Sequence, residues 1–300
     1  MLENPGLRRY LKELAYLVWR LPLFFFARSW LRRTHFTIIH YHKMRPDVFR
    51  EHIEYLARSY TFTPMKTLAE ALSGSQEHIP ENSLTITFDD GWRSNYDLLP
   101  VIREHPCHIT IFLSTGLLGT HRKPGSRALY DDSMMDEDLL PSIISGDVDT
   151  SSLEDHYVMA EERTMLSVDE VREMKEFVDF QSHGVNHHVS TALPLEQLGY
   201  ELRESKRFIE ELTGREVYAF AYPYNIAGKR AAEAVAEAGY KVARVGQRML
   251  NSATTNRYML NSISVVRDCS VSELAKNIEI AKMKTVIHML GQRLKGKAVA

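Results

Sequence analysis

The chain has 300 residues, of which 44% are hydrophobic and 25% charged, as in ordinary globular proteins. Lys and Arg number 37 against 39 Asp and Glu, so the formal charge of −2 lacks the basic excess typical of nucleic-acid-binding proteins. Two cysteines, Cys107 and Cys269, are too few for a disulfide framework or a four-thiolate zinc site. Any metal site must therefore use histidine and carboxylate ligands.

Residues 1–34 form a basic, aromatic segment with seven Lys or Arg against two Glu, a net charge of +5. Its apolar residues are interrupted by Arg20 and Pro22, and no small-residue cleavage pattern follows, which excludes a membrane span and a cleavable signal peptide. We expect a helix that either packs on its own domain or makes peripheral contact with a membrane. The missing cleavable signal favours a cytoplasmic location.

From residue 36 onward, short runs rich in β-branched and aromatic residues alternate with stretches that have apolar residues at helical spacing. This alternation is typical of an α/β domain with a parallel sheet or barrel, here predicted for residues 35–270. The seven expected strands are residues 36–41, 84–88, 108–113, 178–181, 219–222, 241–245 and 263–266. The expected helices are residues 49–59, 95–104, 168–176, 195–212 and 229–238, and Gly214 and Gly239 end the last two.

Two further segments depart from the alternation. Residues 119–165 have eleven acidic residues against four basic ones and several Pro and Gly breakers, which predicts a long acidic insertion. We expect it to be either a lid or wall of the cleft or a solvated loop. Residues 271–300 predict a C-terminal helical segment with a basic end.

The expected strand 84–88 leads directly into Asp89, Asp90 and Gly91. Adjacent carboxylates repel each other, and a bound cation resolves that conflict. One aspartate would then bind the ion while its neighbour remains free as a general base. A solvated Asp-Gly turn is the alternative, so this motif alone decides little.

The segment after the strand 178–181 contains His183 and His187, which are four residues apart. On a first helical turn both imidazoles would face one ion, whereas His188 would face away. Together with one aspartate they form a two-histidine, one-carboxylate set, which suits catalytic zinc but also the non-haem Fe(II) oxygenases. Counting ligands does not separate these two classes.

Two more clusters follow expected strands. Residues 222–225 (YPYN) form a Pro turn that can direct a backbone N–H toward an oxyanion, with tyrosine rings as a wall for a sugar, or they form an ordinary strand exit. His40 and His42 lie on one side of the first strand, and the one at its tip could reach a site at a barrel mouth.

In combination these clusters resemble the polysaccharide deacetylase family, the metal-dependent hydrolases that share the NodB homology domain, also called carbohydrate esterase family 4. The matching motifs are TFDDG (residues 87–91), SHGVNH (182–187) and AYPYN (221–225). The early YH pair at residues 41–42 is similar to the branch that includes exopolysaccharide deacetylases. The resemblance implies a distorted, incomplete (β/α) barrel of about seven parallel strands, flanked by N- and C-terminal helices.

The resemblance also implies roles for individual residues. Asp89 would be the general base and His42 the general acid. In many relatives the acid is a histidine late in the chain, but the only late candidate here, His288, lies in an expected amphipathic helix. Asp90, His183 and His187 would bind a divalent metal, most commonly Zn²⁺, with Co²⁺, Ni²⁺ or Mn²⁺ as alternatives. The substrate and the oxyanion would contact Trp92, Tyr222, Pro223 and Tyr224.

The third motif departs from the family at both ends. Many members begin it with Arg and end it with Gly, where this chain has Ala221 and Asn225. Asn tolerates the left-handed backbone conformation that Gly would adopt, so the turn is expected to persist. The missing Arg leaves open which residue orients Asp89, and we assign no function to His188.

These roles describe hydrolysis of an N-acetylated glycan or lipid-linked sugar by a metal-activated water. Deformylation or ester hydrolysis differs only in the bond that is cleaved. A non-catalytic carbohydrate-binding relative would be expected to lack a ligand or the base, and all of them are present here. An Fe(II) oxygenase would usually have a jelly roll of antiparallel strands, which the alternation of strands and helices disfavours.

Overall fold

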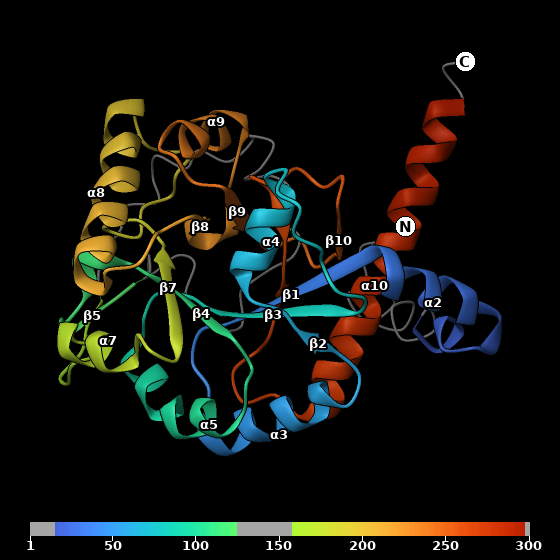
Figure 1. The fold of residues 1–300 in the computed structure, drawn as a ribbon, viewed down its shortest axis with the longest axis horizontal. Helices are drawn as coiled ribbons and strands as arrows, with labels where there is room; N and C mark the ends of the chain where they lie inside the picture. The colour runs from blue at the N-terminus through green and yellow to red at the C-terminus, as the bar shows by residue number, and fades with distance from the viewer. Residues whose placement is uncertain (1–15, 125–157, 298–300) are drawn as a thin grey trace.

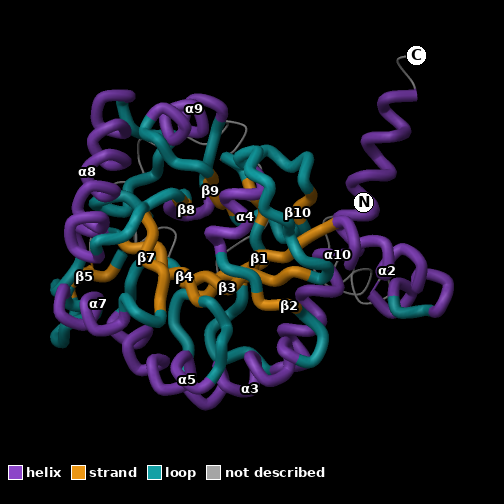
Figure 2. Tube along the Cα trace, in the orientation of Figure 1, coloured by secondary structure: helices purple, strands orange, loops and turns teal. Residues whose placement is uncertain are grey.

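The computed structural model describes residues 16–124 and 158–297 (Figure 1). Its centre is a mostly parallel sheet in the order β10-β1-β3-β4-β7-β8-β9-β11, which curls into a nearly closed barrel surrounded by helices (Figure 2). The edge strand β10 (Asn251–Ser252) pairs antiparallel with β1. The parallel strands are β1 (His35–Tyr41), β3 (Ser83–Phe88), β4 (Ile109–Leu113), β7 (Val178–Ser182), β8 (Ala219–Ala221) and β9 (Val242–Val245). The predicted incomplete (β/α) barrel is therefore confirmed.

The seventh expected strand, residues 263–266, is shorter than predicted, and a further short strand precedes it. β11 (Leu260–Asn261) pairs with β9, and β12 (Ile263–Ser264) pairs with β1, so the intervening residue lies at the seam of the barrel. The Ser262 hydroxyl donates to the Val245 carbonyl (2.7 Å) and contacts His40 Nδ1 (2.9 Å). Side-chain hydrogen bonds thus span the seam where the backbone ladder is interrupted.

Helices pack around the outside of the barrel and bury the apolar faces of the strands. They are α3 (Pro46–Ala57), α5 (Leu99–Glu104), α7 (Val168–Met174), α8 (Leu195–Thr213), α9 (Lys229–Glu237) and α10 (Val271–Lys297). Each expected helix is present, but the expected helix 95–104 begins as the 3-10 helix η2 (Arg93–Leu98). Gly214 and Gly239 have φ of 71° and 83°, so both helix-end predictions are confirmed.

Helix α4 (Met65–Leu72), which the helical spacing did not single out, covers one end of the barrel. It follows the short strand β2 (Thr61–Phe62), which pairs with the start of β3. Its Met65 and Leu68 pack against side chains that face the inside of the barrel, such as Phe112. This inner core is separate from the larger core, which lies between the sheet and the outer helices. Because α4 closes the amino ends of the strands, the carboxyl ends form the open mouth.

The N-terminal segment and the acidic insertion are described in part. The N-terminal segment contains η1 (Pro22–Phe24) and α2 (Phe25–Thr34), and Pro22 begins this second helical piece because proline has no N–H to continue the first. The short strands β5 (Arg122–Lys123) and β6 (Val158–Met159) pair antiparallel at the base of the acidic insertion. Residues 125–157, most of the predicted lid or loop, lie outside the described residues.

Candidate active site

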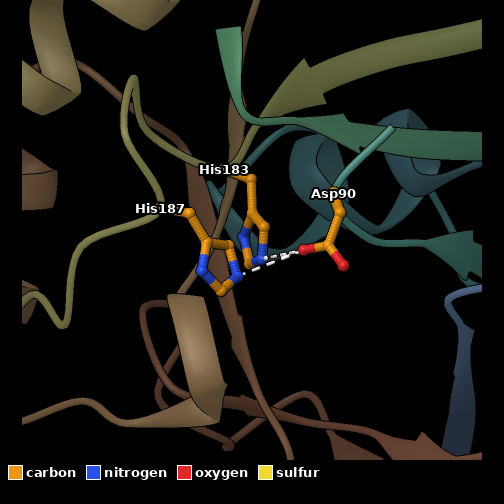
Figure 3. Close-up of side chains that lie close together, drawn as sticks. All are labelled: Asp90, His183 and His187. Atoms are coloured by element: carbon orange, nitrogen blue, oxygen red, sulfur yellow. Dashed lines mark ion pairs between the residues drawn. The ribbon is translucent and has the colours of Figure 1, made fainter. Parts of the chain in front are cut away.

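Three side chains converge at the mouth of the barrel, from the loops after β3 and β7 (Figure 3). Asp90 Oδ1 lies 3.1 Å from His187 Nε2 and 3.4 Å from His183 Nε2, and all three side chains are buried. Asp90 has a positive φ of 73° and is followed by Gly91, whose φ is 82°. This tight turn directs the Asp90 carboxylate into the mouth instead of along the strand.

The hydrogen bonds made by Asp90 and His183 leave one lone pair on each side chain, and these lone pairs face the same point. His183 Nδ1 lies 2.7 Å from the Ala221 carbonyl, which can only accept, so Nδ1 carries the proton and Nε2 keeps its lone pair. The Trp92 indole donates to Asp90 Oδ2 (2.7 Å), which leaves Oδ1 buried without a hydrogen bond. Buried lone pairs that face one another are unfavourable without a cation, so these atoms fit a metal ion.

The loop that contains the two histidines is not helical, so the expected helical turn is wrong. Gly184 and His187 both have positive φ, of 81° and 59°, and this irregular path brings the imidazoles together. Their ring centroids are 4.8 Å apart, and the Tyr224 ring lies 4.6 Å from that of His187. The spacing of four residues correctly indicated that His183 and His187 lie together, but they lie on an irregular loop and not on a helical turn.

Glu201, on α8, holds this loop through four contacts. Its Oε2 accepts the backbone N–H groups of Val185 (2.6 Å) and Asn186 (2.9 Å). Its Oε1 accepts the Asn186 side-chain amide (2.7 Å) and lies 3.3 Å from His188 Nδ1. His188 therefore points away from the three converging side chains, as expected, and acquires a partner that the sequence did not indicate.

Asp89 lies beside Asp90, and the guanidinium of Arg244 on β9 pairs with its Oδ1. Both side chains are almost completely buried. Burial by itself raises the pKa of Asp89, but Arg244 and then the nearby histidines outweigh it and lower that pKa to about 2. Asp89 is therefore ionised at neutral pH.

Arg244 is in turn fixed by the seam of the barrel. It donates to Asn225 Oδ1 (3.1 Å) and to the Ser262 hydroxyl (3.0 Å). Asn225 has a φ of 58°, which confirms that this asparagine adopts the left-handed conformation expected at the end of the third motif. Arg244 therefore orients Asp89 in place of the arginine that is missing at Ala221, and it approaches Asp89 from a different strand.

The neighbouring His40 has a defined tautomer. The Ser262 hydroxyl gives its proton to Val245 and accepts from Arg244, so His40 Nδ1 must be the donor to Ser262. Burial, followed by the positive charge of Arg244, holds the pKa of His40 well below its ordinary value. His40 is accordingly neutral, and its proton supports the network that orients Asp89.

The two histidines considered as the general acid lie in different parts of the structure. His42 is half-buried at the end of β1, with its ring 5.8 Å from that of His40. His288 is exposed on α10. The structure therefore places His42, and not His288, at the carboxyl end of a barrel strand.

Most of the residues expected to contact the substrate are buried. Tyr222 is fully buried, and its hydroxyl donates to the Tyr258 carbonyl (3.1 Å), so it supports the core. Trp92 is 3% exposed, acts on Asp90 instead, and has the Lys43 ammonium 3.5 Å from its ring centroid. Pro223 is buried, and only Tyr224 of the YPY segment is partly exposed.

Arg244 and Glu201 are site residues that the sequence-based predictions did not include, although the position of each in its strand or helix is unusual for a charged residue. Arg244 lies inside the expected strand 241–245, between the apolar Ala243 and Val245. Glu201 lies on the same helical face as the buried Leu198 and Ser205. A charged residue in a buried strand or stripe requires a partner, and this requirement would have identified both.

Comparison with known proteins agrees with this geometry. The family model described as polysaccharide deacetylase matches residues 76–243, more than half of the chain. The chain belongs to the polysaccharide deacetylase family. Among curated proteins no sequence match is found. His42 and Arg244 both lie outside the matched residues of this deacetylase, so their places come from the structure.

Solved deacetylase structures share the fold. The Streptococcus pyogenes deacetylase PplD in complex with acetate is 19% identical, with a TM-score of 0.61 over 82% of this chain and 99% of that one. IcaB from Ammonifex degensii is 17% identical, with a TM-score of 0.60 over 83% and 98%. A de-N-acetylase from Aggregatibacter actinomycetemcomitans is 15% identical, with a TM-score of 0.61 over 81% and 99%.

Proposed function

We propose that this polysaccharide deacetylase is a metal-dependent hydrolase that removes N-acetyl groups from a glycan, with Asp89 as general base and His42 as general acid. The observation that carries the proposal is the convergence of Asp90 Oδ1, His183 Nε2 and His187 Nε2 beside an ionised, uncoordinated Asp89. Adjacent aspartates in different electrostatic surroundings can serve different roles, one as a ligand and one as a base.

Asp90, His183 and His187 would hold the metal ion, which we propose to be Zn²⁺, because two imidazoles and one carboxylate with open positions suit catalytic zinc. Co²⁺, Ni²⁺ and Mn²⁺ accept the same donors. When bound, such an ion polarises the substrate carbonyl and lowers the pKa of a coordinated water to about 7.

The chain's own residues would move the protons. Arg244 occupies Asp89 Oδ1, so the other carboxylate oxygen is positioned to accept a proton from the attacking water. His42, at the end of β1, would donate to the leaving amine, and the backbone N–H of Tyr224 would stabilise the developing oxyanion. The Tyr224 ring, packed against His187, would form one wall for the sugar.

The substrate and its location are part of the same proposal. An N-acetylated glycan fits the deacetylase fold, and a lipid-linked sugar on the cytoplasmic side of a membrane would be brought to the mouth by peripheral contact through residues 1–34. Formamides and acetate esters require the same base and the same oxyanion site, so the acyl group is decided by assay.

The test is acetate release from N-acetylglucosamine oligomers by the metal-reconstituted protein, with formylated and O-acetylated sugars as parallel arms. Asp89→Asn should reduce turnover about 10²–10⁴-fold while metal still binds in calorimetry. His187→Ala should lose both. Asp179→Asn, which changes a half-buried aspartate at the other end of the barrel, is the matched control and should keep activity.

Release that needs Asp89 and His187 and stops with chelator would establish a metal-dependent deacetylase. Full activity of Asp89→Asn would contradict the assignment of the base. Metal binding without release from any of the three sugars would contradict the proposed substrate class and leave the metal site standing.

A further inference from the structure

Exposed apolar side chains concentrate in one short segment of this protein. Fourteen large hydrophobic side chains are exposed in the described part of the chain, and seven of them lie within residues 17–30. They are Leu17, Val18, Leu21, Leu23, Phe25, Phe26 and Trp30, and we call this surface the N-terminal face. Phe26 is 81% exposed and Leu23 67% exposed. Exposed apolar side chains gathered in one short segment mark an interaction site.

The N-terminal face is held outward by contacts on its opposite side. Trp19 is buried, and its indole donates to Glu279 on α10 (2.8 Å). Phe24 packs against Trp19 with ring centroids 5.3 Å apart, and Leu31 is completely buried in the main core. The segment is therefore docked through one face, and in Figure 1 α2 lies at the outer edge of the molecule, beside α10.

Charge distinguishes the possible partners of this face. Arg20, Arg32 and Arg33 are exposed along it, and residues 14–34 contain four arginines and no acidic residue. A surface that combines aromatic and aliphatic side chains with positive charge alone matches the interface of an anionic bilayer. A second copy of the chain would bring two surfaces of the same charge together, which disfavours self-association through it.

We propose that the N-terminal face binds an anionic lipid bilayer as a peripheral contact. Its apolar side chains would enter the boundary between headgroups and acyl chains, and Arg20, Arg32 and Arg33 would contact lipid phosphates. None of the helices in residues 16–124 and 158–297 is long and apolar enough to cross a membrane, so the contact proposed is one of surface binding. The inference does not rest on the proposed catalytic activity.

The test is sedimentation of the full-length protein with vesicles and no sugar substrate. Binding is expected to vesicles of phosphatidylcholine and phosphatidylglycerol in equal parts, to weaken with salt, and to be much weaker with phosphatidylcholine alone. Arg32→Gln with Arg33→Gln should lower the partition coefficient about thirtyfold, since each arginine near an anionic surface contributes about 1 kcal/mol. Phe25→Ser with Phe26→Ser should lower it about tenfold or more.

The matched control is Leu195→Ser with Val266→Ser, because these side chains are 56% and 61% exposed and lie outside the N-terminal face. This control should bind like the parent protein, and circular dichroism should show all variants folded. Equal binding of the phenylalanine pair and the control pair would overturn the proposal. So would a dimer in sedimentation velocity that the phenylalanine variant dissociates, because a second copy would then occupy the face.

Discussion

Asp89 and Asp179 lie at opposite ends of this barrel, and their electrostatic surroundings differ. At the mouth, Asp89 meets the guanidinium of Arg244, and its pKa falls to about 2. At the base, Asp179 accepts hydrogen bonds from the neutral side chains of Tyr218 and Gln181, and burial still raises its pKa. Hydrogen bonds from neutral groups thus do not offset the effect of burial on the pKa of Asp179, whereas a counter-charge lowers the pKa of Asp89.

The comparison extends to the other buried carboxylates at the mouth. Asp90 Oδ2 accepts the Trp92 indole N–H, and its Oδ1 faces the imidazoles of His183 and His187. Burial raises the pKa of Glu201, but His188 and the N–H groups of the loop outweigh it and lower that pKa. The mouth is therefore built to keep carboxylates charged, as a metal site and a general base require.

The largest effect is expected from removing the counter-charge. Arg244→Gln leaves Asp89 buried and unpaired, which should lower the free energy of unfolding by about 3–5 kcal/mol at pH 7. Adding Asp89→Asn should recover most of that loss, because no uncompensated charge remains, while activity stays absent. Urea denaturation measures both, and an unchanged midpoint for Arg244→Gln would show that the pair does not decide the difference between the two ends.

The next effect concerns Glu201, which holds the histidine loop. Glu201→Gln should weaken Zn²⁺ binding about 10–100-fold, because partners that orient metal ligands have effects of that size. Glu204→Gln, three residues further along α8 and paired with Arg207 outside the loop, is the control and should bind like the parent. Calorimetry gives the affinity, and the visible spectrum of the Co²⁺ form reports ligand geometry. An unchanged spectrum and affinity would assign Glu201 a purely structural role.

A smaller effect is expected in acid for the metal-free protein. The Asp89 carboxyl titrates at about 2 in the folded chain and near 3.8 when unfolded, so the unfolded state binds more protons between these values. The stability from its ionised form is complete above pH 3.8 and lost as pH falls toward 2, a difference on the order of 2 kcal/mol. Thermal unfolding in chelator across this range should show that slope in the parent and not in the Arg244→Gln, Asp89→Asn double variant.

The smallest effect is expected at the base of the barrel, with the opposite sign. The raised pKa of Asp179 means that the folded state binds more protons than the unfolded state above pH 3.8, so this residue lowers stability as pH rises. Asp179→Asn should therefore change the free energy of unfolding by less than about 1 kcal/mol at pH 7, since no ion pair is broken. A loss comparable to that of Arg244→Gln would contradict the contrast between the two ends.

Much of the mouth was predictable because it depends on local chain order. Strands β3 and β7 run into Asp89 and His183, and parallel strands place their carboxyl ends at one edge of the barrel, so these segments had to meet. Asn225 was expected to adopt the left-handed conformation because its side chain tolerates it. The helical turn proposed for His183 and His187 failed because spacing alone does not distinguish a helix from a loop with positive φ.

The alternation of strands and helices and the polar segments at their ends could be predicted from the chain alone, because side-chain periodicity and turn residues act over a few positions. The tertiary structure decided which charges meet. Arg244 reaches Asp89 across 155 positions of the chain, and Glu201 reaches the histidine loop from the next helix. It also decided that Trp19 is buried while Phe26 faces solvent. Such pairings depend on how barrel closure and helix packing place distant residues, which no local pattern records.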